Sequence, residues 1–104
     1  MKDLSPDELK NKLDHGENIF LKLWKKGCGP CRLSKPAVEK LESQYNGTLE
    51  FYQVNVDDHP EILEISESEV LPAFFIFKNQ KLSAKTPGFK GLKKLETFVS
   101  EALA

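Results

Sequence analysis

The sequence has none of the features that direct a protein to a membrane, a nucleic acid or a secretory route. No apolar run is long enough to cross a bilayer, and residues 1–8 carry charge and a helix start where a signal peptide needs an apolar stretch. Fifteen Lys and Arg residues stand against sixteen Asp and Glu residues, so neither sign of charge dominates. We therefore expect no nucleic-acid partner, no membrane partner and a cytoplasmic location.

Cysteine is also scarce, because the chain has only two, and both lie in the segment Cys28-Gly29-Pro30-Cys31. A structural zinc site would need further ligands, and neither His15 nor His59 stands at a finger-like spacing from the pair. A purely structural disulfide around so short a loop would restrict the unfolded chain very little. In a reducing compartment such a pair is more often catalytic than structural, so we expect redox chemistry, with no metal and no cofactor.

The cysteine pair stands where an apolar segment gives way to an amphipathic helix. After its first residue, the segment Asn18 to Trp24 is apolar everywhere except at Lys22, which is typical of a central strand covered on both faces. One helical turn would bring the two sulfurs together, and the free amides and dipole at a helix start favour a thiolate. We therefore expect Cys28 to be the nucleophile and Cys31 to be the resolving thiol that releases the product.

The rest of the chain predicts strands that alternate with helices and end in a hairpin. The predicted helices are Ser5 to about Gly16, Pro30 to about Tyr45 with a kink at Pro36, a short helix within 57–65, and Leu92 to Ala104. The predicted strands are Asn18 to Trp24, Leu49 to Val56, Ala73 to Phe77, and a hairpin partner that ends near Thr86. This order indicates one α/β domain over residues 1–104, with a sheet that is parallel at first and antiparallel later.

Taken in order, several of these motifs resemble the thioredoxin family. The matching residues are the segment Trp24 to Arg32 with its Cys-Gly-Pro-Cys motif, Pro36 in the helix, the step Leu71-Pro72-Ala73 before a strand, and Gly88 ahead of the last helix. The resemblance covers nearly the whole chain and implies the thioredoxin fold, a mixed sheet of four to five strands flanked by about four helices. It also implies a thiol-disulfide oxidoreductase that reduces protein disulfides through a reversible Cys28-Cys31 pair.

The resemblance further implies a substrate surface and a set of partners. It implies that the Leu71-Pro72 bond is cis, that the backbone before Pro72 pairs with the substrate chain, and that Gly88 lies on the same surface. The expected partners are disulfide-containing protein substrates and a separate disulfide reductase, and the protein is expected to be a monomer.

The spacer residues have physical roles that do not depend on the family. Gly29 lets a substrate backbone approach Cys28 closely, and Pro30 stiffens the turn without costing a hydrogen bond. Gly27 precedes the motif where thioredoxins usually have tryptophan, so we expect a smaller and more mobile lip to the substrate groove.

Two further departures lie on the strands behind the motif. Lys22 stands where the family usually places a buried aspartate, and Gln53 stands where a lysine often accompanies that aspartate. Alternation puts Lys22 on the same face as Trp24, so its ammonium must reach solvent, find a partner or lose its proton. Because lysine stems commonly lie over apolar surface, we expect Lys22 to reach solvent along its stem and to have no catalytic part. In a catalytic role, Lys22 would either accept the proton of Cys31 or stabilise its thiolate.

Two alternative functions stay open from the sequence. A glutaredoxin-like protein recycled by glutathione would use the same cysteines, although glutaredoxins usually carry an aromatic residue in the spacer. A binding module on this fold would dock a partner around Cys28, Pro72 and Gly88 with little turnover, because a fold does not determine a function.

Overall fold

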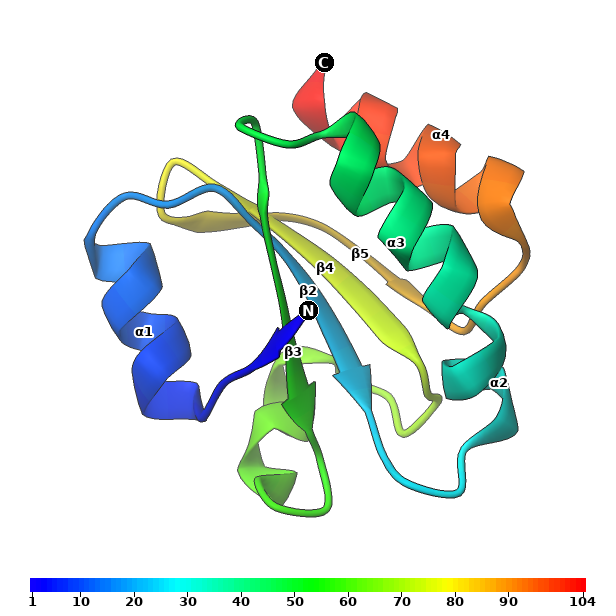
Figure 1. Ribbon diagram of the computed structural model, residues 1–104. Helices are drawn as coiled ribbons and strands as arrows, with labels where there is room; N and C mark the ends of the chain where they lie inside the picture. The colour runs from blue at the N-terminus through cyan, green and yellow to red at the C-terminus, as the bar shows by residue number, and fades with distance from the viewer.

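The computed structural model describes residues 1–104 and places five strands in one mixed sheet (Figure 1). The strands are β1 (Lys2–Asp3), β2 (Ile19–Trp24), β3 (Glu50–Asn55), β4 (Ala73–Lys78) and β5 (Lys81–Pro87), in the spatial order β1-β3-β2-β4-β5. Strands β1 and β2 run parallel to β3, whereas β4 runs antiparallel to both β2 and β5. The predicted change from parallel to antiparallel pairing is confirmed, with β2 at the centre of the sheet.

Four α-helices and one 3₁₀ helix surround this sheet. They are α1 (Pro6–Asp14), α2 (Gly29–Leu33), α3 (Lys35–Gln44), the 3₁₀ helix η1 (Pro60–Ile65) and α4 (Leu92–Leu103). The predicted start of α1 is confirmed, because the Ser5 hydroxyl accepts the Glu8 amide at 3.1 Å and the Glu8 carboxylate accepts the Ser5 amide at 2.9 Å. The predicted short helix within 57–65 forms as a 3₁₀ helix.

The helix predicted from Pro30 to Tyr45 divides into α2 and α3 at Ser34. Pro36 has no amide hydrogen, so the turn before it lacks one hydrogen bond that would continue the helix. The predicted kink therefore appears as a one-residue interruption at Ser34, whose backbone angles stay helical, between two helices. This break leaves the last carbonyl groups of α2 without the partners that a continuous helix would supply.

Each face of the sheet packs against its own set of helices. Helices α1 and η1 cover one face, and α3 and α4 lie side by side over the other (Figure 1). Along β2 the buried side chains alternate between the faces, with Leu21 and Leu23 under α1 and η1 and with Phe20 under α3 and α4. The Phe20 ring stacks on Phe51 with centroids 4.7 Å apart. Because both faces are covered, β2 and β4 are buried along nearly their whole length.

Candidate active site

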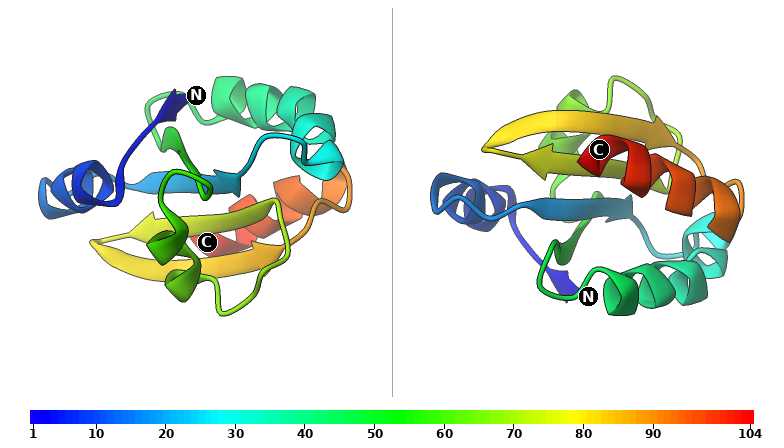
Figure 2. Two further views of the ribbon diagram at one scale, coloured as in Figure 1. Left: turned by 90° about the horizontal axis from the view of Figure 1, so that it is seen from below. Right: turned by 90° about the horizontal axis from the view of Figure 1, so that it is seen from above.

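A short loop leads from the carboxyl end of β2 into α2 (Figure 2). The cysteine pair lies at the start of that helix. Cys28 is the N-cap of α2 with extended backbone, and its sulfur accepts the Cys31 amide at 3.2 Å. The two sulfurs form a disulfide with the Cα atoms 5.2 Å apart, so the structure represents the oxidised state. Cys28 is half-buried, whereas Cys31 is only 3% exposed. A molecule that approaches from solvent therefore reaches Cys28 first.

The residues around Cys28 shape the loop for a close approach. Gly27 has a φ of +74°, a left-handed conformation that glycine adopts without strain. No atom lies within 4 Å of the position that a Cβ would take on Gly27 or Gly29, so the space above both residues is open. Pro30 occupies the first turn of α2, where its missing amide hydrogen would be unpaired in any case.

A second segment reaches the same end of the sheet from β4. Ala73 pairs with Leu23 in register, so the start of β4 lies beside the end of β2. The Leu71-Pro72 peptide bond is cis, as the resemblance implied. The Gly88 amide donates to the Pro72 carbonyl at 2.7 Å. This hydrogen bond brings Gly88 to the same end of the sheet as Pro72. The structure therefore gathers the predicted substrate-binding residues at the end of the sheet that carries the cysteines.

Exposure differs among the residues of this second segment. Pro72 is fully buried, so its ring has no contact with solvent. Leu71 is half-buried, and no backbone hydrogen bond involves its amide or carbonyl group. Val70 is 51% exposed and its side chain comes within 3.7 Å of the Cβ position on Gly88. An incoming peptide would find free backbone groups at Leu71 and apolar surface at Val70.

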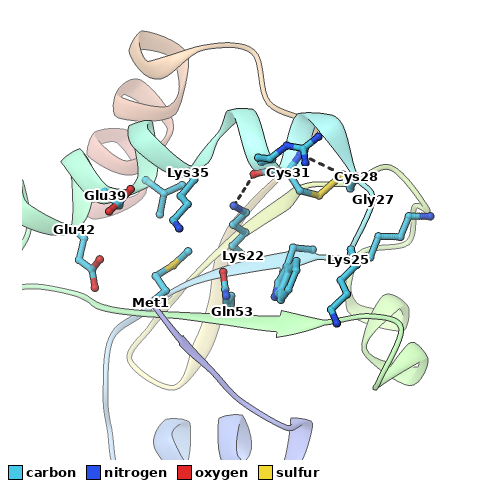
Figure 3. A pocket seen from close by; sticks show the side chains of 14 residues that line it. Met1, Lys22, Lys25, Gly27, Cys28, Cys31, Lys35, Glu39, Glu42 and Gln53 are labelled. Carbon is cyan, nitrogen blue, oxygen red and sulfur yellow. Dashed lines mark hydrogen bonds between the residues drawn. A yellow bond between two sulfur atoms is a disulfide. The ribbon is translucent and has the colours of Figure 1, made fainter.

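A pocket of about 470 Å³ opens on the other side of the cysteine pair, toward β3 (Figure 3). Its wall includes both cysteines, Trp24 from β2 and Gln53 from β3, whereas Leu71, Pro72 and Gly88 are not part of it. The Trp24 ring nitrogen donates to Asp3 at 2.8 Å, and the Gln53 amide donates to the same carboxylate at 3.1 Å. Trp24 therefore lies beside the cysteines, as expected, and Gln53 is held by Asp3.

Lys22 lies in this pocket and is only 4% exposed. Its ammonium group donates to the Cys31 carbonyl at 2.9 Å (Figure 3). The Ser34 hydroxyl donates to the same carbonyl at 2.7 Å. Burial lowers the pKa of Lys22 below its ordinary value, and the positive charge of Lys35 lowers it further. The expectation that the stem would reach solvent is wrong, because α2 covers it and offers a carbonyl group as partner.

Ser34 and Lys35 complete the surroundings of Lys22, and neither was predicted from the sequence. Ser34 is fully buried, and its only sequence signal is the spacing of three residues from Cys31, at which a hydroxyl can reach the carbonyl one turn back. Lys35 is exposed at the start of α3, and its side chain points into the pocket (Figure 3). The role of neither residue follows from the sequence, because both roles depend on where the helix is interrupted.

Positive charge gathers around the pocket. Four exposed cations and two carboxylates line it in addition to Lys22, namely Lys25, Lys26, Arg32, Lys35, Glu39 and Glu42. None of these groups takes part in a salt bridge. An excess of cations near a thiol favours the thiolate form, although exposed charges are partly screened by salt.

Comparisons with known proteins agree with this arrangement. The family model described as Thioredoxin matches residues 1–101. The chain belongs to the thioredoxin family. Among curated relatives, Thioredoxin 1 of Chlorobaculum tepidum is 29% identical over 85 residues, which span 82% of this chain and 84% of the relative. Thioredoxin of Mycoplasma genitalium is 30% identical over 79 residues, which span 76% of each chain.

A solved structure shows the same fold. Oxidised mitochondrial thioredoxin 3 of Saccharomyces cerevisiae superposes with a TM-score of 0.86 at 24% identity, covering 97% of this chain and 94% of that one. The predicted thioredoxin fold is therefore confirmed.

Membership of the thioredoxin family, together with the disulfide between Cys28 and Cys31, makes this chain a thiol-disulfide oxidoreductase. Proteins of the thioredoxin family act on disulfide-bonded protein substrates and are themselves reduced by a reductase. No helix of the structure combines the length and apolar character that a membrane crossing requires.

Proposed function

We propose that this protein is a cytoplasmic electron carrier that accepts electrons from a separate reductase and passes them to disulfide-bonded proteins. It would act as a monomer and as one domain over residues 1–104. The observation that carries the proposal is the unequal exposure of the two cysteines, with Cys28 half-buried at the start of α2 and Cys31 buried one turn further on. A pair arranged in this way attacks with its outer sulfur and resolves with its inner one.

The reaction has two steps. The Cys28 thiolate attacks one sulfur of the substrate disulfide, which breaks that bond, forms a mixed disulfide and releases one substrate thiolate that takes a proton from water. The Cys31 thiolate then attacks the Cys28 sulfur, restores the Cys28-Cys31 disulfide and releases the second substrate sulfur as a thiolate, which also takes a proton from water. Two electrons pass from the cysteine pair to the substrate, and a reductase returns two electrons to the pair. The spacing between Cα atoms of 5.2 Å allows both states with little backbone movement.

Substrate binding is proposed to use backbone pairing beside Cys28. The free amide and carbonyl of Leu71 can pair with an extended peptide, as a sheet edge does when it gains a strand. Open space above Gly27 and Gly29 lets that peptide bring its disulfide to the Cys28 sulfur. Buried Pro72 and the hydrogen bond from Gly88 hold the Leu71 backbone at the proposed binding surface.

Turnover of insulin disulfides with dithiothreitol as the electron source tests this function. The parent protein is expected to accelerate insulin reduction over the reductant alone, and Cys28→Ser is expected to abolish the acceleration. If the parent gives only the rate of the reductant, the chain is a binding module. A glutathione-coupled protein would be recycled by glutathione, whereas the proposed carrier would need a nicotinamide-dependent or ferredoxin-dependent reductase in its place.

A further inference from the structure

Lys22 is the only charged side chain that is buried in the sheet, and the proposed reaction as described does not use it. Its register partner on β4 is Phe74, so the equivalent place on the neighbouring strand is apolar. Building on the proposed function, we propose that Lys22 is a positioning residue for the second step, in which its ammonium group serves as the counter-ion of the Cys31 thiolate.

One hydrogen bond places the ammonium group beside the backbone of Cys31. The bond to the Cys31 carbonyl uses one of its three N–H groups and holds the Lys22 nitrogen 2.9 Å from the carbonyl oxygen. No other hydrogen bond or ion pair engages Lys22, and Lys22 and Cys31 line the same pocket. Figure 3 shows the amine directed toward Cys31 rather than toward the carboxylates at the far end of the pocket. The remaining N–H groups can therefore face a negative charge on the Cys31 sulfur.

The charges that face Lys22 favour this pairing. From β3 only the uncharged Gln53 faces it, and Met1, the residue before β1, adds its α-amino group to the same pocket. The Asp3 carboxylate of β1 accepts hydrogen bonds from Gln53 and Trp24. The charged side chains from the loop, α2 and α3 are Lys25, Lys26, Arg32, Lys35, Glu39 and Glu42, of which four are positive. In the oxidised protein, Lys22 therefore carries a charge that burial and Lys35 both disfavour. A thiolate at Cys31 appears only on reduction and offsets both effects.

The pairing is reciprocal and linked to the redox state. If the ammonium lowers the pKa of the Cys31 thiol, the thiolate must raise the pKa of Lys22 by the same amount. The disulfide has no such charge, so the effect on Lys22 disappears on oxidation. The ammonium keeps its proton throughout, and the step is balanced as before, with the Cys31 thiolate attacking Cys28 and the substrate thiolate leaving.

A counter-ion also predicts a distinctive pH profile. It increases the fraction of thiolate tenfold for each pKa unit, but a less basic thiolate is less nucleophilic, with a Brønsted coefficient of roughly 0.4–0.5. Removing a counter-ion worth about one unit would therefore slow resolution about threefold below the pKa of Cys31 and accelerate it about threefold well above that pKa. The pH profiles of the resolution rate with and without the counter-ion would therefore cross. A base would give slower resolution throughout without a crossing.

The first test uses the unmodified protein, so it does not depend on how a variant folds. Nuclear magnetic resonance of the Lys22 side chain follows its titration in the oxidised and the reduced state. We expect a pKa that is about one unit higher after reduction. Equal pKa values in the two states would overturn the proposal.

The second test separates the two steps with 5,5′-dithiobis(2-nitrobenzoate) as the substrate. Attack by Cys28 releases one coloured thiolate in a concentration-dependent phase, and resolution by Cys31 releases the second in a concentration-independent phase. For Lys22→Met we expect an unchanged first phase and crossing profiles for the second. If the parent protein released no coloured thiolate in the first phase, the proposed roles of the cysteines would be wrong.

Two control variants distinguish a counter-ion from a simple tether. Ser34→Ala removes the other donor to the Cys31 carbonyl but keeps the positive charge. Lys40→Met removes an exposed charge from α3 outside the pocket. Both are expected to keep the profile of the parent. If Ser34→Ala reproduced the Lys22→Met profile, Lys22 would only hold the carbonyl, and the proposal would be wrong.

Discussion

Strands β2 and β4 lie side by side at the centre of the sheet. They differ in the charge of one buried residue, because β2 carries Lys22 where β4 carries Phe74. Both are covered on two faces and buried, and their first five residues include no other charge than Lys22. Its partner Phe74 is fully buried and lies with its ring centroid 5.6 Å from that of Phe20. The buried charge of Lys22 therefore lies where β2 faces the cysteine-bearing helix α2 and the pocket beside it. This contrast indicates that Phe74 contributes to stability, whereas β2 gives up some stability at Lys22.

The largest expected effect comes from removing the apolar member of this pair. Phe74→Ala would leave a cavity between Phe20 and α4 that the surrounding side chains fill only partly. We expect a loss of about 3–5 kcal/mol in the free energy of unfolding, measured by urea denaturation with an unchanged oxidised disulfide. Leu82→Ala on β5 is the control, because Leu82 is 43% exposed and should cost far less. If Phe74→Ala lost less unfolding free energy than Leu82→Ala, the proposed contribution of Phe74 to stability would be wrong.

A smaller effect of opposite sign is expected at Lys22. At neutral pH, Lys22→Met should leave the oxidised protein equally stable or more stable by about 1–2 kcal/mol, because a buried charge is replaced by an apolar side chain of similar length. The folded pKa of Lys22 is lowered, so the unfolded chain binds more protons between that pKa and the ordinary value. The parent should therefore gain stability as pH rises through this window, and the advantage of the variant should shrink. Urea denaturation at several pH values measures both effects, and a clear loss of stability in the variant at neutral pH would contradict them.

The smallest change is expected far from the two central strands. Ser5→Ala removes the hydroxyl that caps α1 and should cost about 1 kcal/mol of unfolding free energy. Helix α1 covers the face opposite Lys22, so the rate of insulin reduction should stay that of the parent. A changed rate would show that the functional part of the molecule extends beyond β2 and α2.

Much of the fold could be predicted because its signals are local. The helix start at Ser5, the apolar run before the cysteines and the hairpin that follows the strand from Ala73 all follow from short-range sequence patterns. The interruption at Ser34 was predicted only as a kink, because a proline shows where a helix is disturbed but not by how much. The 3₁₀ form of η1 was not predicted, since six residues hold too few apolar positions to separate the helix types.

The candidate site was predictable in part. The cysteines and the spacer followed from the motif, and the cis bond at Pro72 followed from the family resemblance. The environment of Lys22 could not be read from the sequence, because it depends on α2 lying over the end of β2 and on a carbonyl group left free there. The free backbone of Leu71 was likewise expected only by resemblance, since hydrogen bonding between distant segments has no local signal.

The unequal roles of Cys28 and Cys31 are tested most directly by trapping the mixed disulfide. Single-cysteine variants are incubated in their reduced state with a disulfide-bonded protein, and covalent adducts are measured by mass spectrometry at neutral pH. Cys31→Ser is expected to accumulate an adduct through Cys28, because the attacking sulfur remains and the resolving one is gone. Cys28→Ser is expected to form almost none, because Cys31 is 3% exposed. An adduct that accumulates in Cys28→Ser and is absent from Cys31→Ser would reverse the assignment and contradict the proposed reaction.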